Sequence, residues 1–306
     1  MKFNCGSNLA EGQLFSSFLR FVTLSLLFAA IACIPAVADP VVQVTDCGTV
    51  ISQPGHYILA NDLNCGLPVS GILRNSTPTT PWWQMQNPFA SPNGQAPTDP
   101  PPPFGILIVS DHVDLALNGH TISGDLNSNE FGIAVGNPFS SVGNAHVHIT
   151  GPGTVTQWFI AVVFSGSSFS SVTEVTADTN GVGFLDLGGS KNAFDGNTAT
   201  NNAFFVFAGA ITLVQSSGDA VRNNTVTNNV FGIIDLGGGT SNDVRFNTVT
   251  NNFGVGIGIA GTGDSIFLNT VTGTTDGADM QDTNANCDSN MWKHNTFGTA
   301  NQPCIN

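Results

Sequence analysis

An Asn-Thr pair that returns at nearly regular intervals constrains the fold of this chain more than any other feature. The pairs begin at Asn197, Asn224, Asn247, Asn269 and Asn295, with intervals of 27, 23, 22 and 26 residues. A period in this range is typical of a solenoid, in which each repeat forms one coil. Helical solenoids would also show Leu and Ala at a period of 3.6 residues, and no such pattern is visible.

Apolar side chains flank every pair at fixed spacing. Side chains alternate between the two faces of a strand, so both flanking positions are predicted to face the interior. Stacked strands lie about 4.8 Å apart, and the Asn side chains are therefore predicted to form a structural ladder. The position two residues after each Asn holds Ala199, Val226, Val249, Val271 and Phe297, and the position three residues before it holds Phe194, Val221, Val244, Ile266 and Trp292.

A further strand in each coil follows an Asn-Asn pair. An offset of 23 residues aligns Ile234 with Ile257 and predicts that both lie in the core. Because the faces alternate, Asp235 and Gly258 are then predicted to point outward. The same alignment assigns Leu185, Leu187, Phe207, Leu236 and Ile259 to the core, and Asp186 and Ala208 to the outward column.

The outward column supplies a candidate catalytic pair, Asp186 and Asp235. Two coils separate the two backbones by about 9 to 10 Å, close to the spacing at which two carboxyl groups act as acid and base across a glycosidic bond. The alternative is structural. Each Asp precedes Leu-Gly-Gly, and a carboxylate in that position commonly accepts hydrogen bonds from turn amides.

The N-terminal part carries segments that are similar to a known family. They are Cys47-Gly48, Pro54-Gly55-His56-Tyr57-Ile58-Leu59, Asp62-Leu63-Asn64-Cys65 and the run from Val113 to Ile122. With the repeat, the chain resembles secreted right-handed parallel β-helix proteins of the pectin-lyase-like superfamily, although Ala116 stands where such strands often carry Asp. The resemblance implies an all-β, single-domain solenoid with exposed strand faces. Enzymes, adhesins and proteins of other function share this fold, so it does not determine the function.

Residues 1–38 are predicted to be an export signal, because an apolar run from Phe21 to Ile34 precedes the small residues Ala36 and Ala38. The mature chain, 39–306, is expected to be secreted or periplasmic, monomeric and without a membrane span. A Pro-rich segment at 75–103 is predicted to be a surface loop, since Pro cannot donate to a strand ladder.

Four cysteines remain in the mature part, as one pair near each end. In an oxidising compartment such pairs predict disulfides, Cys47 with Cys65 and Cys287 with Cys304. Zinc is the alternative, but the two-residue spacing of structural zinc sites does not occur.

The predicted mature chain holds 5 Lys and Arg against 20 Asp and Glu, a formal net charge of −15. Such a charge disfavours nucleic acid, anionic membranes and polyanionic sugars, and neutral glycans fit more easily. Trp82 and Trp83 are candidate sugar-stacking residues, or they hold the loop against the body.

Arg222 and Arg245 stand two residues before successive ladder asparagines. They predict either a clamp for a uronate carboxylate or an ion-pair network with nearby aspartates. Asp114, His146 and His148 could ligate a metal, but surface histidines are the commoner explanation. We therefore expect no metal site and no cofactor; calcium has no support in the sequence.

The leading hypothesis is a secreted β-helix that binds extracellular or cell-envelope polysaccharide along an exposed strand face. The alternatives are a glycoside hydrolase or polysaccharide lyase, and a structural or adhesive surface protein without catalysis. No catalytic motif is complete. Asn75 and Asn223 fit the glycosylation pattern, which matters only in a source that glycosylates secreted proteins.

Overall fold

The computed structural model describes residues 40–66, 104–126, 130–136, 143–203 and 209–306. Within these ranges the chain is almost entirely β structure, with one short 3-10 helix, η2 (Ala285–Cys287). The predicted export signal, and the loop at 75–103 with Trp82 and Trp83, lie outside the described residues. The remainder is a right-handed parallel β-helix, so the predicted fold class is confirmed.

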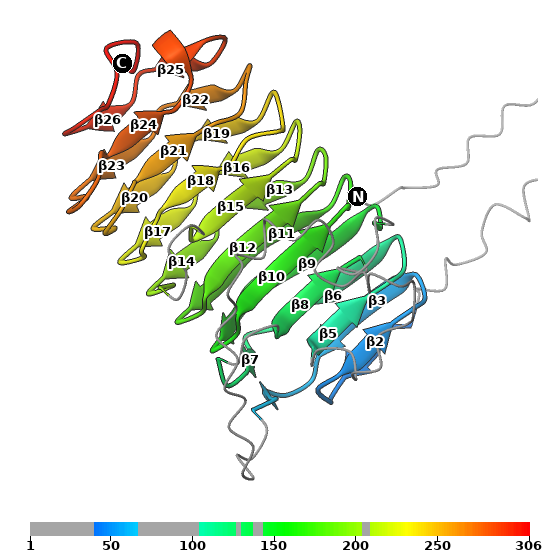
Figure 1. The fold of residues 1–306 in the computed structure, drawn as a ribbon. Coiled ribbons are helices and arrows are strands. Elements are labelled where there is room, and N and C mark those ends of the chain that lie inside the picture. The colour runs from blue at the N-terminus through cyan, green and yellow to red at the C-terminus, as the bar shows by residue number, and fades with distance from the viewer. Residues whose placement is uncertain (1–39, 67–103, 127–129, 137–142, 204–208) are drawn as a thin grey trace, which may run out of the picture. The chain divides into compact units, whose positions relative to one another are not determined.

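The described strands form two sheets whose coils stack in chain order (Figure 1). Neighbouring strands pair in parallel, as Ile233 with Ile257 in one sheet and Val226 with Val249 in the other. The nine-stranded sheet holds β2 (Thr49–Ile51), β5 (Phe104–Ile108), β8 (Phe131–Val135), β10 (Ile160–Ser165), β12 (Val182–Leu187), β15 (Ile211–Val214), β18 (Ile233–Asp235), β21 (Ile257–Ile259) and β24 (Met280–Asp282).

The second sheet has seventeen described strands and contributes two strands to a typical coil. They are β1 (Val42–Val44), β3 (Gly55–Leu59), β4 (Leu63–Asn64), β6 (Val113–Ala116), β7 (Thr121–Ser123), β9 (Val147–Thr156), β11 (Ser171–Asp178), β13 (Ala193–Asp195), β14 (Thr198–Thr200), β16 (Ala220–Arg222), β17 (Thr225–Thr227), β19 (Asp243–Arg245), β20 (Thr248–Thr250), β22 (Ser265–Phe267), β23 (Thr270–Thr272), β25 (Met291–Lys293) and β26 (Thr296–Phe297).

The core lies inside the coils and consists of stacked apolar columns. The predicted inward columns are confirmed, because Phe194, Val221, Val226, Val244 and Val249 are all fully buried. Aromatic rings also contact each other there, as the tilted rings of Phe164 and Phe194 have centroids 5.5 Å apart. Identical apolar positions in successive coils thus bury a continuous core that no single coil could form.

Three ladders of polar side chains occupy the corners between strands. In the ladder predicted from the Asn-Thr pairs, Asn247 Oδ1 accepts from Asn224 N at 2.9 Å, and Asn247 Nδ2 donates to Val221 O at 2.8 Å. A second ladder comprises Asn180, Asn202, Asn229 and Asn252, and the third comprises Asn192, Asp219, Asn242, Asp264 and Asn290. Each ladder satisfies backbone N–H groups that a turn would otherwise leave buried and unpaired.

Both predicted disulfides are present, Cys47 with Cys65 and Cys287 with Cys304. The first joins the earliest coil to the segment just after β4. The second joins η2 to the segment that follows β26. Each bridge therefore lies at one end of the described solenoid, where the strand stack stops.

Candidate functional site

The expected outward orientation of Asp186 and Asp235 is wrong. These two residues are 0% and 2% exposed and lie on the inward face. The register pairs Asp235 with Ile259, an offset of 24 residues, where the sequence alignment used 23. A change of one residue reverses the face of every side chain in a strand, so Ile234 and Gly258 point outward instead.

The buried surroundings of Asp186 and Asp235 match the structural alternative. Asp186 accepts hydrogen bonds from Gly189 N at 2.9 Å and from Asn192 Nδ2 at 2.7 Å. Asp235 accepts from Gly237 N at 2.7 Å and from Asn242 Nδ2 at 3.0 Å. Burial raises the pKa of both carboxyl groups. The catalytic prediction required both side chains to point outward, and neither does.

Two core assignments next to these aspartates also change. Leu236 is 38% exposed, so its predicted core position is wrong. Leu185 is 1% exposed as expected, but it faces outward in register with Thr212 and, through β15, with Ile234. Phe207 and Ala208 lie outside the described residues.

Arg222 and Arg245 both contact Asp243. Arg222 Nε donates to Asp243 Oδ2 at 2.8 Å, and Arg245 Nε contacts the other carboxylate oxygen. The arginine side chains are 42% and 38% exposed, and that of Asp243 is 15% exposed. The ion-pair alternative is therefore present, and a ligand carboxylate would have to compete with Asp243 for both guanidinium groups.

The histidines near the N-terminal end do not converge. His56 Nδ1 lies 2.9 Å from Asp114 Oδ2, and His148 Nδ1 lies 2.8 Å from Ser171 Oγ. His146 does not join Asp114; its ring stacks on that of His112 with centroids 4.9 Å apart. In the part of the chain that the structure describes, no three His, Cys, Asp or Glu side chains are grouped to hold a metal ion.

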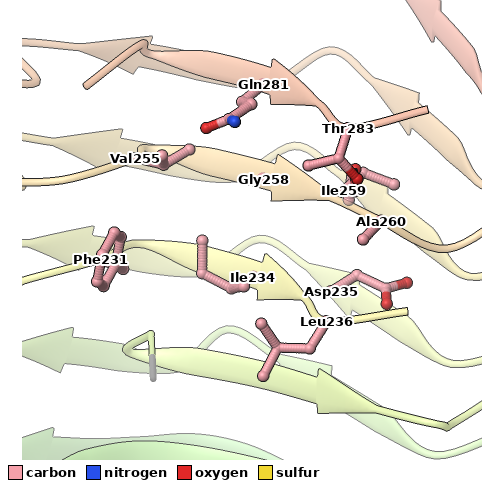
Figure 2. Close-up of a pocket in the computed structure, with 10 residues that line it drawn as sticks. All are labelled: Phe231, Ile234, Asp235, Leu236, Val255, Gly258, Ile259, Ala260, Gln281 and Thr283. Carbon is pink, nitrogen blue, oxygen red and sulfur yellow. The ribbon is translucent and has the colours of Figure 1, made fainter. Parts of the chain in front are cut away.

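A groove of about 290 Å³ lies on the outer face of β18, β21 and β24 (Figure 2). Its centre is the outward column in which Ile234, Gly258 and Gln281 pair on successive strands. Gly258 has no side chain, so the surface is hollow between its two neighbours. The groove is lined by Phe231, Ile234, Asp235, Leu236, Val255, Gly258, Ile259, Ala260, Gln281 and Thr283.

The groove has an apolar floor with polar groups at one side. Phe231 and Val255 lie toward the start of the strands, whereas Thr283 lies beyond their ends (Figure 2). The amide of Gln281 and the hydroxyl of Thr283 can each donate and accept hydrogen bonds. Such a surface suits a ligand with apolar faces and hydroxyl edges. Sequence reasoning missed it because the assumed register turned Ile234 inward; in the central column of Ile234, Gly258 and Gln281, only Gly258 was predicted to point outward.

No helix among the described residues has both the length and the apolar character needed to cross a membrane.

The profile of one protein family matches residues 109–302 of the chain, and that family is described as NosD, periplasmic copper-binding protein. No curated protein matches significantly. The matched range includes most coils of the solenoid, the groove and both arginines.

Two solved structures show the same fold. The DFA-IIIase from Arthrobacter chlorophenolicus A6, crystallised without its lid, superposes with a TM-score of 0.53 at 13% identity, covering 90% of this chain and 76% of that chain. The Dettilon tailspike protein gives a TM-score of 0.50 at 16% identity, covering 85% of this chain and 54% of the tailspike. This chain thus spans about half the length of the tailspike. At these identities the likeness concerns the fold alone.

Copper, which the family description names, does not fit the described residues. Proteins hold copper mainly through Cys, Met and His. The four described cysteines form disulfides, and nowhere among the described residues are three His, Cys, Asp or Glu side chains grouped to hold an ion. We therefore assign no role to copper in this chain.

Proposed function

The chain belongs to the NosD family, and from this premise we propose that it is an extracytoplasmic β-helix protein that binds neutral polysaccharide in the groove over β18, β21 and β24. We favour binding without cleavage. The predicted catalytic pair, Asp186 and Asp235, is buried and accepts hydrogen bonds from turn amides. The observation that carries the proposal is the groove itself.

Sugar rings combine apolar C–H faces with a rim of hydroxyl groups. Ile234 and Phe231 offer apolar surface to the ring faces, and Gln281 offers an amide to the hydroxyls. The groove follows the strand stack, so a chain of sugars could extend over neighbouring coils. An elongated glycan would then gain contacts that a single sugar lacks.

Charge favours a neutral glycan over an acidic one. The whole chain has a formal net charge of −14. Like charges repel at close range, so a polyuronate would bind only where a cation bridges the two surfaces. The solvent-exposed guanidinium groups of Arg222 and Arg245 are already paired with Asp243.

The first test is retention of purified protein on neutral and acidic polysaccharides, with and without calcium, together with assays for new reducing ends and unsaturated products. We expect retention on a neutral polysaccharide and no products. Product release would make the protein a hydrolase or lyase. If the protein is neither retained nor releases products, the proposal is contradicted and a structural or adhesive role is favoured.

A substitution within the groove assigns the binding to this face. Gly258→Leu fills the hollow between Ile234 and Gln281, so it should reduce retention on the polysaccharide at least tenfold. The fold should stay intact, because only side-chain tips of Ile234 and Val255 lie within 3.2 Å of the added Cβ. The matched control is Ser265→Leu, which places the same leucine side chain on the outward face of β22 in the same coil. Equal retention by both variants would place the binding elsewhere.

A further inference from the structure

One corner of the solenoid, between the nine-stranded sheet and the following strand, carries one buried carboxyl group in each of five successive coils. The carboxyl group alternates between two positions. The position at the strand end holds Asp186, Leu213, Asp235, Ile259 and Asp282, and the ladder position holds Asn192, Asp219, Asn242, Asp264 and Asn290. We call the five aspartates, Asp186, Asp219, Asp235, Asp264 and Asp282, the acid column; each is at most 2% exposed.

An Asn at the ladder position uses both halves of its carboxamide. Asn242 Oδ1 accepts from Asp219 N at 3.0 Å. Asn242 Nδ2 donates to Ser216 O at 3.2 Å and to Asp235 Oδ2 at 3.0 Å. The site therefore needs one acceptor atom and one donor atom, which is what a carboxamide provides.

An Asp at the same position provides the acceptor but, when ionised, not the donor. Asp264 Oδ1 accepts from Asn242 N at 2.7 Å, and Asp219 Oδ1 accepts from Asn192 N at 2.9 Å. The second oxygen of each, Oδ2, takes the place of the amide NH2 and is buried without a hydrogen-bond partner. An unpaired charged oxygen in a dry interior is strongly unfavourable.

The carboxyl group of the preceding coil lies beside that unpaired oxygen. Asp235 Oδ2 and Asp264 Oδ2 each lie 2.5 Å from the point where a Cβ on Gly261 would stand, so the two oxygens are within about 5 Å of each other. Asp235 already accepts two hydrogen bonds, from Gly237 N and Asn242 Nδ2. The ionised form of Asp235 is therefore better stabilised than that of Asp264. A proton on Asp264 would replace the repulsion between the two carboxylates with a hydrogen bond from Asp264 to Asp235.

The titratable groups that face these carboxyls are acidic, and the Ser216 hydroxyl also lies beside Asp219. Asp264 faces Asp235 and Asp282, and Asp219 faces Asp186 and Asp235. Burial raises the pKa of Asp264 to about 7, with Asp235 adding to the effect. Burial also raises the pKa of Asp219 and raises that of Asp186 well above its ordinary range, where Asp219 adds to the effect. The charged groups that act on these pKa values include no cation among the described residues.

We propose that Asp264 is a proton-binding site, in which a proton takes the place of an amide hydrogen and is donated to Asp235, and that Asp186 and Asp219 share a second proton in the same column. The column then forms two acid pairs, Asp219 with Asp186 and Asp264 with Asp235. Each pair carries one negative charge instead of two. The protein thereby gains a pH-sensitive element in its core, separate from the groove.

The sign of the pH dependence follows from the raised pKa. A carboxyl group that is harder to ionise in the folded state stabilises the fold at low pH, and this stability is lost as pH rises through the folded-state value. For Asp264 the loss falls between the ordinary value of 3.8 and about 7. Most aspartates in ion pairs behave in the opposite way.

The test measures the melting temperature of the full chain between about pH 5 and about pH 8.5 for the wild type, Asp264→Asn, Asp219→Asn and the double variant. Asn restores the donor, so the variants should melt several degrees higher than the wild type at the alkaline end, with little difference at the acidic end. The pH profile of the double variant should be the flattest. Asp276→Asn, at an exposed position, is the control and should follow the wild type.

Two outcomes would overturn the proposal. One is an unchanged pH profile in the double variant, with its circular dichroism spectrum intact. The other is a wild-type melting temperature that rises with millimolar calcium and falls with a chelator, since the unpaired oxygens would then bind a cation in place of protons. Neither outcome depends on polysaccharide binding.

Discussion

At the scale of single residues, the buried asparagines hold the corners of the coils together. The side chain of Asn247 makes four hydrogen bonds: Oδ1 accepts from Asn224 N and Nδ2, and Nδ2 donates to Val221 O and Asn269 Oδ1. We expect Asn247→Ala to lower the free energy of unfolding by about 2 to 4 kcal/mol, because it leaves a buried N–H and a buried C=O unpaired. Urea unfolding would measure this, with exposed Thr248→Ala as the control at under about 1 kcal/mol.

The sequence predicted these asparagines correctly because each has a constant local frame. In every coil, one apolar residue stands three positions before the Asn and another stands two positions after it. A ladder and two inward columns therefore follow from this spacing alone. The acid column has no such frame. Asp186 and Asp219 occupy different positions of their coils, and only the three-dimensional stack makes them neighbours.

At the scale of strands, β18 and β21 show why the face of Asp235 could not be predicted. From Asn229 to Ile233 the chain advances 4 residues, but from Asn252 to the paired Ile257 it advances 5. The extra residue lies in a glycine-rich turn, where the sequence gives no marker for it. The outward residue of β18, Ile234, is as apolar as its inward neighbour Ile233, so alternation between polar and apolar residues does not reveal the register.

The register makes a direct prediction for two adjacent isoleucines. Ile233 is fully buried and faces the interior, so Ile233→Ala should destabilise the fold by about 2 to 5 kcal/mol through a closed cavity. Ile234 lines the open groove, so Ile234→Ala should cost about 1 to 2 kcal/mol and weaken polysaccharide retention. Denaturation of both variants would check this. If Ile234→Ala proved the more destabilising, the 23-residue alignment would be right.

At the scale of the whole solenoid, stability is distributed along the stack, because each coil contacts chiefly the next. Such a protein opens from its ends, where a terminal coil has a neighbour on one side only. The two disulfides lie at these ends. Cys287 is 2% exposed and packs against the core, so the bridge to Cys304 attaches the last coil to the interior.

Hydrogen exchange should therefore show graded protection, highest in β10 to β12 and lower toward β24 to β26. We expect the double variant Cys287→Ala, Cys304→Ala to lower the free energy of unfolding by about 3 kcal/mol, because the disulfide no longer closes a loop between residues 17 positions apart in the unfolded chain. The faster exchange should be confined to the last coils, since the central coils keep both neighbours. A uniform increase along the whole chain would instead mean that the solenoid opens as one cooperative unit, and that the bridge acts on all coils together.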